Sequence, residues 1–107
     1  MNNQEKFSVS ISDSIVIGNI SDVRDLIFSA FDQKLPIAID ISRVTDADIT
    51  LPQLIESARR SAAIEGREIR LSQPADGAVL QLLRRGGFLD SSDPARVDFW
   101  LQGTTPQ

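Results

Sequence analysis

The segment from Pro36 to Gly66 constrains the fold more than any other part of the chain. It opens with an apolar run from Ile37 to Ile41, passes through acidic and hydroxyl residues, and then carries apolar residues at helical spacing from Thr50 onward. No glycine-rich phosphate-binding loop separates the expected strand from the expected helix. This layout favours a helix tip displayed at the surface over a catalytic pocket.

The composition limits the chemistry that the chain can perform. Its 107 residues, 41% of them apolar, predict one domain with a core spanning about residues 7–101 and a frayed tail over 102–107. Cysteine and histidine are both absent, which removes disulfides, thiol nucleophiles, imidazole bases and most zinc or iron sites. We therefore expect a protein that is not an enzyme and that holds no metal or cofactor.

The charge and the hydropathy pattern narrow the range of partners. A net charge of −4 and a pI near 4.6 argue against binding to a phosphate backbone, which needs clustered positive charge. The first residues do not resemble a signal peptide, and no segment approaches the roughly 20 apolar residues of a membrane span. These features predict a cytoplasmic protein without nucleic acid binding or membrane insertion.

The first half of the chain predicts a hairpin followed by a helix. Residues 7–11 alternate between apolar and polar side chains, residues 14–17 form a second run, and the polar pair Ser12-Asp13 between them predicts an antiparallel turn. Ser21 is expected to cap the next helix. The inward positions of that helix are Val23, Leu26, Ile27, Ala30 and Phe31.

The second half predicts further alternation of helices and strands. The helix from Thr50 should end at Gly66 and leave Glu56 on an outer face. Its inward stripe is Leu51, Leu54, Ile55, Ala58 and Ala62. Residues 68–72 should form a strand parallel to the one at residues 37–41, and a third helix should run from Pro74 to the glycines at 86 and 87.

Residues 97–101 allow two interpretations. They form either a closing strand or an apolar turn that docks on the sheet. In a strand, Trp100 would lie on the opposite face from Phe99 and would be exposed. The alternative, in which Trp100 packs against a helix or the N-terminal strand, is the one we favour. The fold class is thus α/β, with a mixed sheet of four to five strands and helices mainly on one face.

Several short patterns in this order resemble the STAS family, named for sulfate transporters and anti-sigma factor antagonists, over roughly residues 7–101. They are the apolar strand 37–41 with its link Ser42-Arg-Val-Thr45, the aspartate Asp48 before a helix that ends at Gly66, and the later segments 66–74 and 82–88. The resemblance implies a single-domain STAS-like fold. It also implies a protein-interaction module of bacterial signalling.

In that family, a serine or threonine that a partner kinase phosphorylates usually follows the aspartate. Here Ile49 occupies that position and cannot accept phosphate, so Thr50 is the substitute candidate for a phosphoacceptor. The segment from Thr50 to Gln53 also fits a capping box, in which the threonine oxygen caps the helix. We favour the cap interpretation.

The acidic residues near this helix allow a metal hypothesis as well. Asp40, Asp46 and Asp48 are clustered in sequence, and hard cations take carboxylate ligands. The spacing lacks the central glycine and the terminal glutamate of a calcium loop, so a solvated acidic rim is the favoured interpretation.

The resemblance implies binding to a signalling protein through the start of the second helix. The expected partners are a chemotaxis-type or two-component histidine kinase, or an anti-sigma factor kinase, and a homodimer is left open. The expected partner-binding residues are Ser21, Asp46, Asp48, Ile49, Thr50 and Gln53. The alternative is the small STAS subunit of a bacterial lipid-transport ABC complex. A small enzyme or nucleotide binder is disfavoured, because the sequence has neither a glycine-rich loop nor a convergent base.

Overall fold

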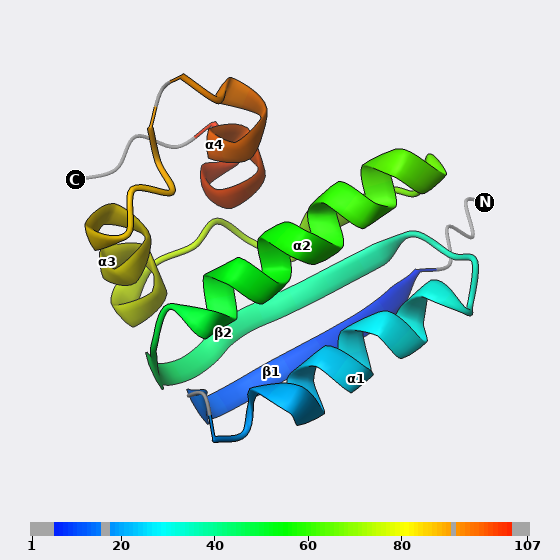
Figure 1. Ribbon diagram of the computed structural model, residues 1–107, viewed down its shortest axis with the longest axis horizontal. Coiled ribbons are helices and arrows are strands. Elements are labelled where there is room, and N and C mark those ends of the chain that lie inside the picture. The colour runs from blue at the N-terminus through cyan, green and yellow to red at the C-terminus, as the bar shows by residue number, and fades with distance from the viewer. Residues whose placement is uncertain (1–5, 16–17, 91, 104–107) are drawn as a thin grey trace.

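The computed structural model describes residues 6–15, 18–90 and 92–103 of the chain. These residues form three strands and four helices, which alternate as far as the third strand (Figure 1). In chain order they are β1 (Phe7–Ile15), α1 (Ile20–Phe31), β2 (Ile37–Ala47), α2 (Thr50–Glu65), β3 (Ile69–Leu71), α3 (Gly77–Arg85) and α4 (Pro94–Leu101).

The described strands form one parallel sheet in the order β1-β2-β3. Phe7 pairs with Ile37, and Ile37 pairs with Ile69 on its other side. The predicted parallel crossover through α2 is confirmed. The predicted number of four to five strands is not found in the described residues, and their sheet is parallel where a mixed one was expected.

The predicted N-terminal hairpin is wrong, because β1 continues through the polar pair that was expected to turn. The register with β2 shifts between Ser10 and Ser12 and again between Asp13 and Ser14. Asp13 has a φ of 68°, a left-handed conformation that aspartate tolerates better than most residues. Bulges of this kind bend a strand without ending it. Residues 16 and 17 of the expected second strand lie outside the described residues.

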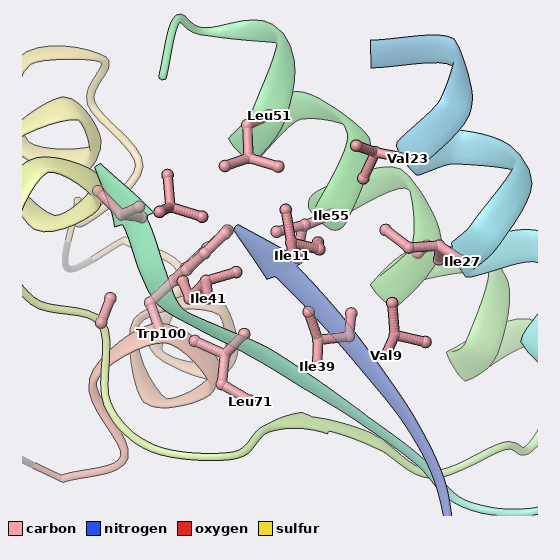
Figure 2. Close-up of a cluster of buried hydrophobic side chains, with 14 of the residues drawn as sticks. Val9, Ile11, Val23, Ile27, Ile39, Ile41, Leu51, Ile55, Leu71 and Trp100 are labelled. Atoms are coloured by element: carbon pink, nitrogen blue, oxygen red, sulfur yellow. The ribbon is translucent and has the colours of Figure 1, made fainter. Parts of the chain in front are cut away.

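The helices cover the apolar face of the sheet. Val9, Ile39 and Leu71 are buried on that face, whereas Ser8 and Arg70 on the other face are exposed. The apolar side chains fill the space between the strands and α1 and α2 (Figure 2). This alternation is the period-two pattern that the sequence shows at residues 7–11 and 68–72, whereas the central strand β2 also buries Ala38.

Helix α1 begins two residues earlier than predicted. Asn19 is its N-cap residue, and the Asn19 side-chain amide donates a hydrogen bond to the Ser14 carbonyl at 2.9 Å. Ser21 therefore lies in the first turn, exposed, and is not the cap. The helix buries Val23, Ile27 and Ala30, as the periodicity predicted. Phe31 is half-buried, and Leu26, which was expected to point inward, is 42% exposed.

Helix α2 confirms the predicted C-terminus but corrects one outer position. Gly66 ends it with a φ of 69°, and the Arg67 N–H reaches the Ala62 carbonyl at 2.7 Å. Four of the five stripe residues are buried, and Leu54 is half-buried. Glu56, expected on an outer face, is only 6% exposed, because Trp100 of α4 packs against it.

Helix α3 begins at Gly77, three residues after Pro74. The delay has a tertiary cause, since the Ala75 N–H donates to the Trp100 carbonyl at 2.8 Å and holds the preceding segment against α4. The helix ends at Arg85, with Gly86 as its cap residue. Its predicted inward positions Val79, Leu82 and Leu83 are buried, whereas Ala78 is exposed.

Residues 94–101 form helix α4, so both the strand and the turn interpretations of residues 97–101 are wrong. The Asp93 side chain accepts a hydrogen bond from the Arg96 N–H at 3.2 Å, and Pro94 stands in the first turn. Trp100 is completely buried, which confirms the packed interpretation. Gln102, expected in a frayed tail, donates a hydrogen bond to the Leu71 carbonyl at 2.7 Å, and residues 104–107 lie outside the described part.

Candidate protein-interaction site

The start of α2 lies at the same end of the domain as the start of α1. In a parallel sheet the carboxyl ends of neighbouring strands meet at one edge, and Figure 1 shows α1 and α2 both beginning there. The structure thus brings Ser21 to the same end as Ile49, although no hydrogen bond joins them in the described chain.

Asp48 fixes the junction between β2 and α2. Its backbone N–H donates to the Ile15 carbonyl at 3.1 Å, and its carbonyl accepts from the Leu51 N–H at 3.2 Å. Asp48 is half-buried. The end of β1 and the first turn of α2 are therefore tied together through one residue, which gives the helix start a defined position.

Thr50 is held by the Asp48 carboxylate. The Thr50 N–H donates to Asp48 Oδ1 at 3.0 Å, and the Thr50 hydroxyl donates to the same oxygen. A carboxylate at this position also interacts favourably with the helix dipole. The side chain that accepts from the first turn is thus Asp48 and not Thr50.

The predicted capping box between Thr50 and Gln53 is wrong. Ile49 is the N-cap residue, its dihedral angles are already helical, and the Gln53 N–H donates to the Ile49 carbonyl at 3.2 Å. Because Thr50 is the first residue of the helix and not its N-cap, the threonine oxygen does not cap the helix, and the Gln53 amide donates to the Ile49 carbonyl instead.

Ile49 forms the apolar tip of this end of the domain. It is 36% exposed, and its side chain packs against Gly86 at the end of α3. A Cβ atom at Gly86 would lie 2.8 Å from Ile49 Cδ1 and 3.0 Å from the Phe88 ring. The missing side chain at Gly86 therefore allows Ile49 and Phe88 to approach each other.

Gly86 and Phe88 were not predicted as site residues. The Gly-Gly-Phe sequence was interpreted as the stop of a helix, and its contact with Ile49 depends on how α3 packs beside the end of β2. From Phe88, a groove of about 360 Å³ continues along the outer face of α2. Gln53, Ser57, Arg60 and Ile64 line it.

The two remaining acidic candidates, Asp46 and Asp40, have different surroundings. Asp46 is exposed. Asp40 accepts hydrogen bonds from the Ser42 hydroxyl at 2.7 Å and the Ser42 N–H at 2.9 Å, and the hydroxyl bond first, then the N–H bond, lowers the pKa of the Asp40 carboxyl. Within residues 6–15, 18–90 and 92–103, no three acidic side chains are grouped so that they could hold a metal ion.

A family model described as the STAS domain matches residues 2–101, which is nearly the whole chain. The chain belongs to the STAS domain family. Searches of curated proteins and of solved structures gave no match. STAS domains mediate protein–protein interactions and are generally non-enzymatic, so membership indicates a regulatory or protein-interaction role. No helix among the described residues is long and apolar enough to cross a membrane.

Proposed function

We propose that this STAS domain is a non-enzymatic regulatory module that docks a bacterial signalling protein through the start of α2. The proposed partner is a histidine kinase of the two-component or chemotaxis type, or an anti-sigma factor. The docking surface consists of Asp46, Asp48, Ile49, Thr50 and Gln53, with Ser21 at its margin. We infer that the module is cytoplasmic.

The observation that carries this proposal is the exposure of Ile49 on a rigid support. Its side chain is 36% exposed at a helix start that Asp48 ties to the end of β1. Behind it lie Gly86 and Phe88. An apolar anchor that is already held in place loses little conformational entropy on binding, which is typical of interface hot spots.

Thr50 beside this anchor is the candidate phosphoacceptor. Its hydroxyl is engaged with the Asp48 carboxylate, so phosphate transfer would first break that hydrogen bond. The product would place nearly two negative charges next to Asp48 and repel it. We therefore infer that the unmodified surface is the binding form and that Ile49 supports binding without phosphate.

The test compares two isoleucine substitutions on the same helix. Ile49→Asp places a charge at the proposed anchor, and Ile64→Asp places the same charge at the far end of α2, where Ile64 is 87% exposed. We expect Ile49→Asp to weaken binding to a purified kinase or anti-sigma factor by tenfold or more, and Ile64→Asp to leave it unchanged. Titration calorimetry gives both affinities.

Either of two results would refute the proposal. One is an unchanged affinity of the folded Ile49→Asp protein, and the other is equal loss in both variants. The ATPase of a lipid-transport ABC complex is included as a third binding partner in the same titration. Tight, Ile49-dependent binding to that ATPase alone would replace the signalling proposal by the transport alternative.

A further inference from the structure

The outer edge of β3 carries backbone groups that the sheet does not use. On its inner side, the Ile37 N–H donates to the Glu68 carbonyl at 2.9 Å, and the Ser72 N–H donates to the Ile39 carbonyl at 2.8 Å. Alternate residues of a strand direct their backbone groups to the same neighbour. Ile69 therefore directs its N–H and C=O groups away from β2.

Leu71 follows the same alternation and confirms the direction of this edge. Its carbonyl, which points away from β2, accepts a hydrogen bond from Gln102 Nε2 at 2.7 Å. In the described part of the chain, the Ile69 N–H and C=O and the Leu71 N–H have no hydrogen-bond partner. Leu71 is only 1% exposed, so the N–H and C=O of Ile69 are the two outward groups that another chain can reach on this side of the strand.

A groove of about 520 Å³ opens beside this edge. Ile69 lines one wall. The other wall is one face of α4, since its residues are spaced by three or four positions along the helix. They are Ala95, Asp98, Phe99 and Gln102. The groove is therefore bounded by a strand edge and by a helix of mixed apolar and polar character.

The groove exists because the last segment of the fold is a helix. Its Trp100 indole donates to Glu56 at 3.1 Å, and its Trp100 carbonyl accepts from the Ala75 N–H at 2.8 Å. These contacts hold α4 beside β3 without placing its backbone in the ladder. The closing strand that the sequence allowed at residues 97–101 would have been a candidate for this edge.

We propose that this groove binds an extended segment of another protein, which adds to β3 as a fourth strand of the described sheet. An extended backbone supplies the acceptor and the donor that the Ile69 N–H and C=O need. Alternate side chains of the segment would contact Phe99 and Ala95, while the charged Glu68, Arg70 and Asp98 border polar ones. This surface is separate from the start of α2, so the inference does not depend on the proposed function.

The opposite edge of the sheet is less suited to such pairing. Strand β1 has two register shifts, and bulges twist an edge strand and disrupt a regular ladder. The groove beside β3 instead offers regular backbone geometry next to the apolar ring of Phe99. β-Strand addition is therefore expected at β3.

The experiment uses a peptide selected from a random displayed library on the intact chain. Ile69→Pro removes the outward N–H without touching the ladder to β2, a change that edge strands tolerate. Ile69→Ala removes the same side chain but keeps the N–H, and is the matched control. We expect Ile69→Pro to weaken peptide binding roughly tenfold relative to Ile69→Ala.

Amide NMR locates the peptide. The expected result is shifted signals at Ile69, Leu71 and Phe99, slower hydrogen exchange at the Ile69 N–H, and unchanged signals at Ile49. If Ile69→Pro unfolds the chain, Ala95→Trp replaces it, because Ala95 is exposed and a tryptophan there would fill the groove. Recovery of no peptide, equal binding to the variants, or shifts confined to the start of α2 would overturn the inference. Loss of binding in Ile49→Asp would bear on the proposed function alone.

Discussion

The indole nitrogen of Trp100 lies 3.1 Å from Oε2 of Glu56, inside the contact between α2 and α4. Arg59 donates to both carboxylate oxygens of the same glutamate at 3.0 Å. A carboxylate that is only 6% exposed would be costly without such partners. Glu56 therefore joins the last helix of the domain to the central one.

Replacing Glu56 by alanine should destabilise the domain strongly. The change leaves the buried Trp100 N–H without its acceptor and Arg59 without its ion-pair partner. We expect a loss of about 2–4 kcal/mol in the free energy of unfolding. Urea titration followed by tryptophan fluorescence measures it. The control Glu65→Ala changes an exposed residue of the same helix, and similar losses in the two variants would contradict the role of Glu56.

Arg67 is predicted to fasten the end of α1. Its guanidinium donates to the carbonyl of Phe31, the last residue of that helix, at 2.6 Å and to the carbonyl of Leu35, in the loop that follows, at 2.8 Å. Arg67→Ala should lower the free energy of unfolding by about 2 kcal/mol, because carbonyls at a helix end lose charged donors. Arg70→Ala is the control, since that side chain is 70% exposed. A loss below that of the control in thermal unfolding would refute the prediction.

The hydrogen bond from Ser42 to Asp40 should make the free energy of unfolding depend on pH in the acidic range. The Ser42 hydroxyl lowers the pKa of the folded Asp40 carboxyl below the unfolded value, so the stabilisation is present above the unfolded pKa. It is lost as the pH falls through the folded pKa. Ser42→Ala should therefore destabilise the protein at neutral pH and match the wild type in strong acid. Ser8→Ala is the control, and a pH-independent difference for Ser42→Ala would contradict the linkage.

Local sequence signals predicted the elements whose boundaries are set locally. Gly66 ended α2 where expected, and the alternation around Ile69 predicted a strand. The alternation at residues 97–101 was misleading, although Asp93 and Pro94 already formed a helix start. Where one residue pattern fits both the helical and the strand period, tertiary contacts decide which element forms. Here the burial of Trp100 favours the helix.

The candidate site also combines features that the sequence predicts with features that depend on tertiary contacts. The exposed Ile49 at the start of α2 follows from the order of strand and helix alone. The contact of Ile49 with Gly86, and the buried bond between Glu56 and Trp100, join residues that are far apart in sequence. No single-sequence pattern reports such pairs, because each partner is an ordinary residue of its own element.

Gly86→Ala should alter the proposed docking surface at a small cost in stability. The backbone of Gly86 has a φ of −88°, which alanine adopts freely, but the new Cβ would press on Ile49 and Phe88. We expect a loss of about 0.5–1.5 kcal/mol in unfolding free energy and a severalfold weaker partner affinity. Gly18→Ala, with nothing within 4 Å, is the matched control. Unchanged affinity in calorimetry would show that partners do not sense the position of Ile49.

The Thr50 hydroxyl should contribute to helix stability and should not be needed for binding. Thr50→Val keeps the shape but removes the hydroxyl that donates to Asp48, so we expect a loss of about 0.5–1 kcal/mol. Asp48→Ala removes the acceptor of both the Thr50 hydroxyl and its N–H, so it should cost more, about 1–2 kcal/mol. Partner affinity of Thr50→Val should stay at the wild-type value. Mass spectrometry of the native protein after incubation with its partner kinase and ATP tests whether Thr50 is modified. A phosphorylated Thr50 peptide, together with lost signalling in Thr50→Val, would contradict the inference that the unmodified surface is the binding form.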